Sequence, residues 1–391
     1  MKITRIETFI LGTGSAKDLL FCRVETEDGL YGWGEAYVTQ GKEKVVAECI
    51  QSMAPHVIGR SAFNIRHTGQ VMYEDFAIKR GSPELSAAWS AIEIACWDIL
   101  GKRAGLPVYN LLGGASRERV RVYANGWSRG STIEEGVERG RQVKAMGFTA
   151  AKFDPFPGPW RSFVDRRDED FAIDYVRAMR QALGPEFELL IEAHRRFAPA
   201  HAIRIGHRLA EFGIDWYEEP CLSENIDLVA EVQRAVPIPI VTGEAIYSKE
   251  AFFECLVKRA ADILNPDICA MGGITAMLDI AAMAQPQAVV MAPHNFNSTL
   301  VGLAATVHVS AVIPNFRITE YFVNFEDLCG EIATSSLSVK DGWIDLPTAP
   351  GLGIDIDVSK LRAHPHQEVT HRGFRQYWEE YPRKGYTPSL R

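Results

Sequence analysis

Short apolar runs that each end in a polar residue recur through the middle of the chain and alternate with segments of helical apolar spacing. The eight runs end at Asn125, Lys152, Glu192, Glu218, Glu244, Asp267, His294 and Glu320. Successive ends are 27, 40, 26, 26, 23, 27 and 26 residues apart. A strand, a helix and two short loops together take about 25 residues. Eight βα units at this spacing therefore predict a parallel (β/α) barrel.

An open, doubly wound sheet is built from the same βα unit and is the alternative fold. The count of eight units argues against it, as does the early segment GTGSAK, which does not continue as GxGxxG and precedes no helical pattern. The motifs GxxxxGKS/T, GxSxG and HExxH are also absent from the sequence. The sequence therefore argues against nucleotide binding, serine hydrolysis and zincin-type hydrolysis.

The N-terminal part has a different pattern, typical of a small antiparallel sheet followed by a helix. Strand-like pieces cover residues 3–10 and 21–26, and Asp28-Gly29 predicts a hairpin turn. A helix is expected to start at Ser82-Pro83-Glu84, to continue over residues 85–101 and to stop at Gly105-Leu106-Pro107. Residues 1–120 are therefore predicted to form an α+β domain.

The other boundaries follow from where the βα repeat begins and ends. We expect the barrel to span residues 121–325. Beyond it the sequence shows short apolar pieces with Pro and Gly and then an aromatic, basic tail, so residues 326–391 are predicted to return to the first domain. The longest interval, between Lys152 and Glu192, contains the Pro-rich stretch PFPGPWRSFVDRRDED. We expect it to form a loop over the barrel mouth that closes over a ligand.

Composition and charge narrow the class of protein. The chain has 391 residues, 47% of them hydrophobic and 24% charged, which is ordinary for a soluble globular protein. Its net charge is −8 and no stretch concentrates basic residues, which argues against a nucleic-acid partner. The N-terminus lacks a signal-peptide apolar run, and Glu93 and Asp98 interrupt the apolar stretch at 85–100, so we expect no membrane segment and a cytoplasmic location. The seven cysteines show no CxxC pairing and are predicted to be reduced core residues.

Carboxylates at three successive strand ends predict a metal site. The C-terminal ends of barrel strands share one mouth, so Glu192, Glu218 and Glu244 are expected to converge there. Three carboxylates would repel one another strongly unless a cation lay among them. Ligation by oxygen alone favours Mg²⁺ over zinc or copper. Solvated surface carboxylates are the alternative interpretation of any one of them.

Asp267 and His294 end the sixth and seventh strands, which are neighbours in a barrel. An Asp that accepts the Nδ1 hydrogen of a His fixes the tautomer of the ring, and Nε2 then becomes a credible general base. The alternative is a pair of structural side chains. Their position beside the predicted metal site favours the catalytic interpretation.

With these strand ends in place, the chain resembles the enolase superfamily, mandelate racemase subgroup. The motifs that carry the resemblance are ACWDILGK, GLP and LLGG within residues 95–114, and IEAH, YEEP, TGE, NPDICAMGGIT and APHN in the barrel. Within the subgroup, RVYANGW, AAKFDPF and LIEAH are most similar to acid-sugar dehydratases of the gluconate/galactonate type. The likeness covers almost the whole chain, up to PGLG at residues 350–353.

The resemblance implies an α/β fold, namely a modified (β/α)7β TIM-like barrel with an α+β capping domain contributed by both chain ends. It also implies that a base removes the proton α to a carboxylate and that the metal stabilises the enediolate, a pattern that is general for this superfamily. Family members keep the first Glu of the pair Glu218-Glu219, so Glu218 is the expected ligand and Glu219 the alternative. Family members are usually dimers or larger, so a homo-oligomer is expected.

Two further residues at the mouth are expected to hold the substrate carboxylate. Three carboxylates, Mg²⁺ and the substrate carboxylate leave excess negative charge, and Lys152 at the end of the second strand would offset it. Glu320 matches the family position that hydrogen-bonds the other carboxylate oxygen. To donate, it must be protonated, so we expect its pKa to be raised by the neighbouring negative charge. Its alternative is an ion-paired rim residue.

The residues of the second and third strands favour a dehydratase over a racemase. In the racemases of the family the last Lys of a KxK motif is the second base, whereas here the motif is Lys152-Phe153-Asp154. Elimination needs an acid for the departing β-hydroxyl. His194 lies two residues after Glu192 and shares its strand face, which is the position of the acid in the gluconate/galactonate-type dehydratases.

The expected substrate is therefore an aldonate or aldarate, and the product a 2-keto-3-deoxy acid. Candidates for binding its hydroxyl groups are Asp154, Asn125, Trp127, Arg196, Asn295 and the cap loop 11–18. Trp127 and Arg196 have local packing or pairing as their alternative. Ala193, Arg195 and Ala245 depart from the closest pattern and leave the substrate open. The rival functions are an epimerase, racemase or cycloisomerase of the same superfamily and a non-catalytic sugar-acid binding protein.

Overall fold

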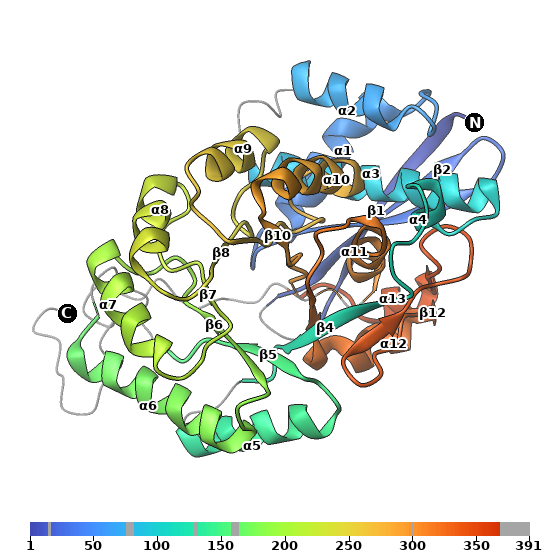
Figure 1. Ribbon diagram of the computed structural model, residues 1–391. Helices are drawn as coiled ribbons and strands as arrows, with labels where there is room; N and C mark the ends of the chain where they lie inside the picture. The colour runs from blue at the N-terminus through green and yellow to red at the C-terminus, as the bar shows by residue number, and fades with distance from the viewer. Residues whose placement is uncertain are drawn as a thin grey trace, which may run out of the picture.

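A computed structural model describes residues 1–14, 17–75, 82–128, 132–157, 164–296, 298 and 300–367. Its centre is a barrel of parallel strands (Figure 1). The strands are β4 (Arg119–Asn125), β5 (Ala150–Phe153), β6 (Glu188–Glu192), β7 (Trp216–Glu218), β8 (Ile240–Thr242), β9 (Ile263–Leu264), β10 (Val290–Met291) and β11 (Thr319–Phe322). Each pairs in parallel with its neighbour in chain order from β4 to β10, and β11 pairs with β4.

Backbone hydrogen bonds between β10 and the residues before β11 close the barrel. The Met291 amide donates to the Asn315 carbonyl at 2.8 Å, and the Arg317 amide donates to the Met291 carbonyl at 2.9 Å. The predicted barrel is therefore confirmed, and the open doubly wound sheet is wrong. The eight strands contain or immediately precede the eight predicted strand ends.

Helices connect the strands and surround the barrel (Figure 1). They are α5 (Ile133–Ala145), α6 (Arg166–Leu183), α7 (Pro199–Ala210), α8 (Ile226–Ala235), α9 (Lys249–Val257), α10 (Gly273–Ala284) and α11 (Val301–Val312). Side-chain caps fix several starts: Thr132 accepts the Glu135 amide and Ser248 accepts the Ala251 amide, each at 3.2 Å. One of these helices follows each strand from β4 to β10, as expected for a (β/α)7β barrel, and β11 is followed only by the short helices η3 (Val323–Phe325) and α12 (Glu326–Ile332).

The interior of the barrel is a packed apolar layer rather than a channel. It takes one residue from each strand or its flank, and all are buried: Tyr123, Ala150, Leu190, Trp216, Val241, Ile263, Ala292 and Ile318. The rings of Tyr123 and Trp216 pack edge to face within this layer, with their centroids 5.3 Å apart, which fills the space. This layer supports the strand ends from below and holds them at fixed separations.

The N-terminal unit is an antiparallel sheet of β1 (Ile3–Leu11), β2 (Leu19–Thr26) and β3 (Tyr31–Ala36), covered by α1 (Glu43–Val57), α2 (Ile65–Glu74), α3 (Pro83–Ala104) and α4 (Val108–Leu111). The predicted start and stop of α3 are confirmed. Ser82 accepts the Leu85 amide, and Gly105 ends the helix with a φ of 68°. A Cβ on Gly34 would lie 1.7 Å from the Ala91 carbonyl oxygen, so only glycine lets α3 pack this closely on β3.

The C-terminal segment consists of β12 (Ala333–Ser335), β13 (Trp343–Asp345), β14 (Asp355–Ile356) and α13 (Val358–Ala363). β13 pairs antiparallel with the start of β4. Asp355 accepts hydrogen bonds from the Tyr31 hydroxyl at 2.6 Å and the Trp33 indole at 2.7 Å, which ties this segment to the N-terminal sheet. The division at residues 120 and 325 stays a prediction.

Two predicted features lie outside the described residues. The aromatic, basic tail is not described beyond residue 367, and the Pro-rich loop is not described at 158–163. Among the described helices, none is both long and apolar enough to cross a membrane. All seven cysteines are free thiols, and six of them are buried.

Candidate active site

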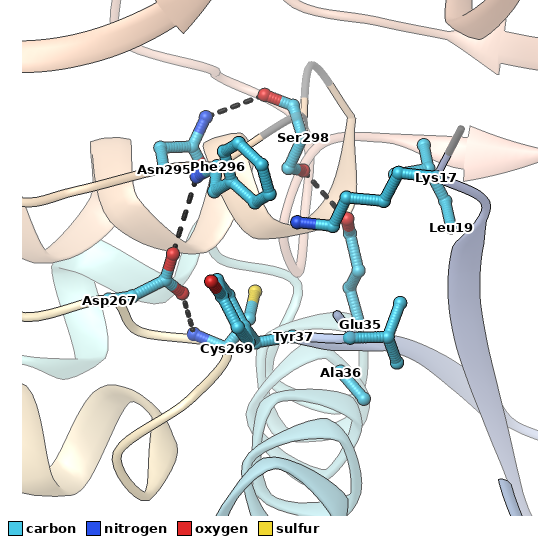
Figure 2. A pocket seen from close by; sticks show the side chains of 11 residues that line it. Lys17, Leu19, Glu35, Ala36, Tyr37, Asp267, Cys269, Asn295, Phe296 and Ser298 are labelled. Atoms are coloured by element: carbon cyan, nitrogen blue, oxygen red, sulfur yellow. Dashed lines mark hydrogen bonds between the residues drawn. The ribbon is translucent and has the colours of Figure 1, made fainter. Parts of the chain in front are cut away.

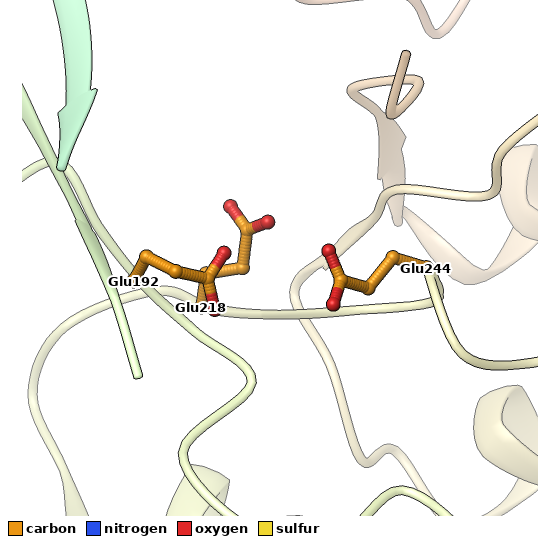
Figure 3. A group of neighbouring side chains, drawn as sticks. All are labelled: Glu192, Glu218 and Glu244. Atoms are coloured by element: carbon orange, nitrogen blue, oxygen red, sulfur yellow. The ribbon is translucent and has the colours of Figure 1, made fainter. Parts of the chain in front are cut away.

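The strand ends of the barrel bring a set of polar side chains to one mouth, and almost all of them are buried. Glu192 ends β6, Glu218 ends β7, and Glu244 follows β8 by two residues. One oxygen of each carboxylate lies within 4.8 Å of an oxygen of the others. Figure 3 shows the three side chains reaching toward a common region from successive strand ends.

The three carboxylates fit a hard divalent cation. Glu192 Oε2 and Glu218 Oε2 are buried and accept no hydrogen bond from the described residues, although the Lys152 ammonium lies 3.3 Å from the Glu192 oxygen. A buried oxygen without a donor is costly, and a bound cation is the partner that such an oxygen prefers. With oxygen donors alone, the set suits Mg²⁺ better than zinc or copper.

The pKa shifts of the triad show that its carboxylates repel one another and depend on neighbouring cations. Burial and the neighbouring Glu192 raise the pKa of Glu218 well above its usual value, against the opposing effect of Lys152. Burial would also raise the pKa of Glu244, but His294 and Arg195 hold it well below its usual value. A cation bound among the three carboxylates would offset their mutual repulsion.

Lys152 lies in the middle of the mouth and contacts three carboxylates. Its Nζ is 2.6 Å from Glu218 Oε1, 3.0 Å from Glu320 Oε1 and 3.3 Å from Glu192 Oε2. Although burial disfavours its charge, Glu218 and Glu320 raise the pKa of Lys152 well above its usual value. Lys152 is therefore a fixed positive charge beside the triad.

Glu219 is turned away from the triad. Its Oε1 accepts the Thr242 hydroxyl at 2.5 Å and the Gly243 amide at 3.0 Å. It thus orients the chain just before Glu244 rather than joining the cluster. This arrangement supports the choice of Glu218 over Glu219 as the ligand.

Asp267 and His294 form the expected pair. The His294 Nδ1 lies 2.7 Å from Asp267 Oδ2, and its Nε2 points to the mouth, 3.0 Å from Glu244 Oε2 and 3.4 Å from Glu320 Oε2. Asp267 is itself held by the Cys269 amide at 2.8 Å. Burial would lower the pKa of His294, but Glu320 and Glu244 raise it well above its usual value.

His194 is anchored by a second carboxylate. Its Nδ1 lies 2.8 Å from Asp154 Oδ2, and its backbone amide donates to Glu192 Oε1 at 2.7 Å. Burial would lower the pKa of His194, but Glu192 and Asp154 raise it. His194 and Arg195 have φ values of 50° and 60°, which non-glycine residues rarely adopt and which often mark functional sites.

Glu320 corrects one expectation. Its carboxylate accepts the Asn125 side-chain amide at 2.5 Å and the Asn295 backbone amide at 3.0 Å. Burial would raise the pKa of Glu320, but Lys152 and His294 outweigh burial and lower it. Without a bound acid, the direction of this pKa shift is therefore the opposite of the expected one, because Lys152, His294 and the amide donors outweigh burial.

The predicted substrate-binding residues differ in what they contact. Trp127 donates its indole N–H to the Ala124 carbonyl at 3.1 Å and packs on Phe153, as in its local-packing alternative. Arg196 contacts Asp154 and donates to the Ala193 carbonyl at 2.8 Å. Asn295 donates its side-chain amide to the Ser298 carbonyl at 2.6 Å. Asp154, Asn125 and Asn295 each contact a mouth residue directly.

Asn265 is a mouth residue that the sequence did not reveal. Its side-chain amide donates to Glu218 Oε1 at 2.9 Å and so shares that oxygen with Lys152. It lies in the same NPD motif as Asp267. A polar residue two positions before a strand-end acid was the available signal.

Arg195 is a second such residue, and in the sequence it stands out only as a departure from the family pattern. Its guanidinium contacts Glu244 Oε1 and lies 3.5 Å from Glu219 Oε2. Arg195 therefore places a positive charge beside Glu244, whereas Lys152 contacts the other two carboxylates of the triad.

The capping unit contributes a pocket next to the Asp267 side chain (Figure 2). The Lys17 ammonium, from loop 11–18, lies 2.9 Å from the centre of the Phe296 ring and 4.6 Å from that of Tyr37. Burial lowers the pKa of Lys17 to about 7, although Asp267 opposes the shift. Glu35 on β3 accepts the Ser298 hydroxyl at 2.7 Å. Residues 15–16 of the loop lie outside the described part of the chain.

Two family models match the sequence. The model described as Mandelate racemase / muconate lactonizing enzyme, N-terminal domain, matches residues 5–113, and the model described as Enolase C-terminal domain-like matches residues 135–360. Together they cover the capping unit and the barrel that carries the mouth.

Individual relatives align over nearly their full lengths. The D-gluconate/D-galactonate dehydratase of Picrophilus torridus is 33% identical and covers 91% of this chain and 92% of its own. The D-galactarolactone cycloisomerase of Agrobacterium fabrum is 31% identical, with 86% and 89% covered. A solved structure of a mandelate racemase/muconate lactonizing enzyme from Sulfitobacter sp. superimposes with a TM-score of 0.88 at 34% identity, covering 94% of this chain and 96% of its own.

Proposed function

The chain belongs to the mandelate racemase / muconate lactonizing enzyme family of the enolase superfamily, and we propose that it is a Mg²⁺-dependent sugar-acid dehydratase. Its substrate is an aldonate or aldarate of the gluconate/galactonate type, and its product is a 2-keto-3-deoxy acid. The observation that carries the proposal is the pair of carboxylate-anchored imidazoles, His194 and His294, beside one carboxylate triad. The names of the dehydratase relatives agree with it.

Glu192, Glu218 and Glu244 would hold the Mg²⁺ ion. When bound, the ion would polarise the substrate carboxylate and so stabilise the negative charge that develops as the α-proton leaves. Lys152 holds the same carboxylate by charge, and Glu320 fixes Lys152 at 3.0 Å. Glu320 acts as an acceptor here, because Asn125 and Asn295 both donate to it.

His294 is the general base in its neutral form, which a cation on Glu244 would favour by offsetting part of the negative charge that, against burial, raises the pKa of His294. Asp267 holds Nδ1, so the α-proton is taken at Nε2, the nitrogen that points to the mouth. Burial of the pair excludes water from the Asp267 hydrogen bond and keeps the ring in one orientation. The electron pair left on the α-carbon then expels the β-hydroxyl.

His194 is the general acid. Asp154 holds its Nδ1, so Nε2 gives a proton to the departing β-hydroxyl, which leaves as water. The resulting enol tautomerises to the 2-keto-3-deoxy acid. Arg196 contacts Asp154 Oδ2, the same oxygen that holds His194, and so restrains the position of the Asp154 side chain.

A cycloisomerase or epimerase is the second candidate, because one relative carries the name D-galactarolactone cycloisomerase. An epimerase needs a base on each face of the α-carbon, and the position of the second lysine is Asp154, which is engaged by His194 and Arg196. Turnover in D₂O separates the two functions. Epimerisation places deuterium at the α-carbon of recovered substrate, whereas irreversible dehydration consumes the substrate and gives a keto acid.

A screen of aldonate and aldarate stereoisomers tests the proposal directly. Keto acid is detected with semicarbazide, first with Mg²⁺ and then with EDTA. We expect product from at least one acid with Mg²⁺ and none with EDTA. Failure of every acid in a metal-loaded, folded protein would favour a non-catalytic sugar-acid binder instead.

His194→Asn is the matched variant for the acid role. We expect the elimination rate to fall by about 10²–10⁴-fold while α-proton exchange into recovered substrate continues, because His294 is untouched. Loss of exchange together with elimination would contradict the division of roles. Assembly into a homo-oligomer and a cytoplasmic location stay predictions.

A further inference from the structure

A second cavity lies at the opposite end of the barrel from the mouth, where the strands begin. It has a volume of about 400 Å³ and lies over the start of β4, the residues before β11, and β13. We call it the arginine recess and define it by Arg117, Arg119, Arg121, Phe316, Arg317 and Trp343. Cavities of this size accept small organic ligands.

The recess carries an excess of positive charge. Its lining holds four guanidiniums and one carboxylate, that of Glu118. Glu188 adds a second carboxylate, 2.6 Å from Arg121 Nη1 and 3.2 Å from Arg317 Nη2. Asp345, which lies opposite Arg119 in the pairing of β13 with β4, is a third carboxylate, so four positive and three negative charges leave one positive charge at the recess.

Two of the four arginines form no ion pair with any described residue. Arg117 donates to the carbonyls of Ser310 and Ile313, which end α11. Burial lowers the pKa of Arg117, as expected for a cation that lacks a nearby anion. Arg119 is exposed, and its guanidinium lies 4.2 Å from the centre of the Trp343 ring.

Aromatic rings hold these two guanidiniums in place. Arg117 lies 5.1 Å from the centre of the Phe316 ring, and Arg119 lies over Trp343. Arg119, held by its flat face, keeps its N–H edges available for a planar anion, whereas Arg117 already uses one N–H of each Nη on a backbone carbonyl and keeps only its remaining N–H groups. Carboxylate and phosphate groups match that edge with two parallel hydrogen bonds.

We propose that the arginine recess binds a small organic or inorganic anion that carries two or more carboxylate or phosphate groups. Such an anion would neutralise Arg117 and Arg119 together. The site is separate from the mouth, and its existence does not depend on the proposed dehydration.

Calorimetric titration with two probes tests the proposal and separates the two chemistries. Pyrophosphate represents phosphate ligands and citrate represents carboxylate ligands, each titrated in Mg²⁺-free buffer at constant ionic strength. We expect saturable binding of at least one probe, and the tighter one identifies the preferred group. Absence of binding for both at millimolar concentration would overturn the proposal.

Arg119→Gln is the test variant, and Arg234→Gln is its control on the exposed face of α8. We expect the dissociation constant to rise at least tenfold in Arg119→Gln and to stay unchanged in Arg234→Gln. Trp343→Leu, which removes the ring under Arg119, should weaken binding in the same direction. Equal losses in Arg119→Gln and Arg234→Gln would show non-specific attraction and contradict the site.

Two further measurements distinguish the recess from the mouth and from a contact between copies of the chain. His194→Asn, a change at the mouth, should leave probe binding unchanged. Loss of probe binding in this variant would place the probe at the active site. Light scattering of Arg119→Gln should give the same oligomeric state as the unmodified protein. A change in that state without probe binding would identify the recess as a subunit contact and overturn the proposal.

Discussion

The chain buries carboxylates in two regions, and the two differ in what surrounds the oxygens. At the contact between α3 and the barrel, Glu93 accepts three N–H groups: the Ile274 amide at 2.8 Å, the Thr275 amide at 2.9 Å and the Trp97 indole at 2.8 Å. At the mouth, Glu192 Oε2 and Glu218 Oε2 accept no hydrogen bond from the described residues. The same residue type is therefore satisfied in one region and left open in the other.

The satisfied carboxylates hold the two units together. Glu93 lies at the N-terminus of α10, where the first amides lack partners within the helix. Asp98 links the Trp33 amide at 3.0 Å to the Leu352 amide at 2.8 Å, and so joins the N-terminal sheet to the C-terminal segment. These residues interrupt the apolar pattern of α3 because each one accepts backbone N–H groups of other segments.

The open carboxylates mark function, because a stable fold gains nothing from buried oxygens that lack donors. Lys152 and Arg195 offset part of the charge, yet Oε2 of Glu192, Glu218 and Glu219 accepts no hydrogen bond from the described residues. Burial alone therefore does not identify a metal site. Oxygens without donors, together with the convergence of Glu192, Glu218 and Glu244, do.

The largest expected effect follows from removing the base. His294→Asn should lower kcat/KM by at least about 10⁴-fold, because Asn cannot take the α-proton and general-base catalysis is combined here with positioning. Mg²⁺ binding and the melting temperature should stay close to those of the unmodified protein. A variant that keeps a tenth of the activity would contradict the assignment of the base.

The next effect concerns the open region. Glu192→Gln should weaken Mg²⁺ binding by at least about 100-fold, because it removes a charged ligand. Loss of a residue that only hydrogen-bonds to a ligand already lowers metal affinity by about 10–100-fold. In EDTA the melting temperature should change little, because Gln keeps the acceptor of the His194 amide. Although burial opposes it, the attraction of His194 and Lys152 lowers the pKa of Glu192, and the loss of this attraction is partly offset by relief of the repulsion from Glu244.

The stabilisation by added Mg²⁺ should disappear in Glu192→Gln, since a cation that binds the folded state stabilises it by mass action. Thermal unfolding with and without Mg²⁺ measures both effects. A clear loss of stability in EDTA would mean that Glu192 is structural, like Glu93.

Substitution of Glu93, whose oxygens accept hydrogen bonds, should have the opposite effect: it should lower stability and leave Mg²⁺ binding unchanged. Glu93→Gln replaces one acceptor oxygen by a donor and leaves a buried N–H unpaired, which should cost about 1–3 kcal/mol of unfolding free energy. The measurement belongs at pH 8, because burial raises the pKa of Glu93 to about 7 and the carboxylate is ionised above it.

Mg²⁺ affinity of Glu93→Gln should be unchanged. Glu48→Gln, on the exposed face of α1, is the matched control and should leave stability within about 0.5 kcal/mol. If Glu93→Gln weakened Mg²⁺ binding as much as Glu192→Gln does, the contrast between the regions would fail.

The smallest expected effect is a pH dependence at the contact between α11 and α4. His308 accepts the Tyr109 amide at 3.1 Å, and burial lowers its pKa to about 4, against about 6.5 in an unfolded chain. Between these values the unfolded state binds more protons, so the contribution of His308 to stability falls as the pH drops from about 6.5 to about 4.

His308→Asn keeps an acceptor but cannot titrate, so its unfolding free energy should depend less on pH in this range, by at most about 1.4 kcal/mol per pH unit. Denaturant unfolding at several pH values measures the difference. His67→Asn, at an exposed position on α2, should leave the slope unchanged. An unchanged slope in His308→Asn would contradict the lowered pKa.

The sequence predicted the barrel because its apolar runs end at one pitch, and parallel strands bring their ends together whatever the loops do. It therefore also predicted that Glu192, Glu218 and Glu244 would converge and that Asp267 would pair with His294. Contacts between different strand ends were harder to foresee. Asn265 shares an oxygen with Lys152, and Arg195 reaches Glu244 across two strands, which no local spacing reveals.

Charge states were the least predictable property. The pKa of Glu320 was expected to rise because carboxylates lie near it, yet it falls because Lys152 and His294 are closer. Such a sign depends on separations of a few ångströms between residues far apart in sequence. The same holds for Lys17, which the cap loop places beside Phe296.

The most direct measurement is a crystal structure of His294→Asn with Mg²⁺ and the best acid from the screen. One ion should lie about 2.0–2.1 Å from an oxygen of each of Glu192, Glu218 and Glu244, with the α-carbon facing residue 294 and the β-hydroxyl within hydrogen-bond distance of His194. An ion bound elsewhere, or an acid whose β-hydroxyl lies beyond the reach of His194, would contradict the account.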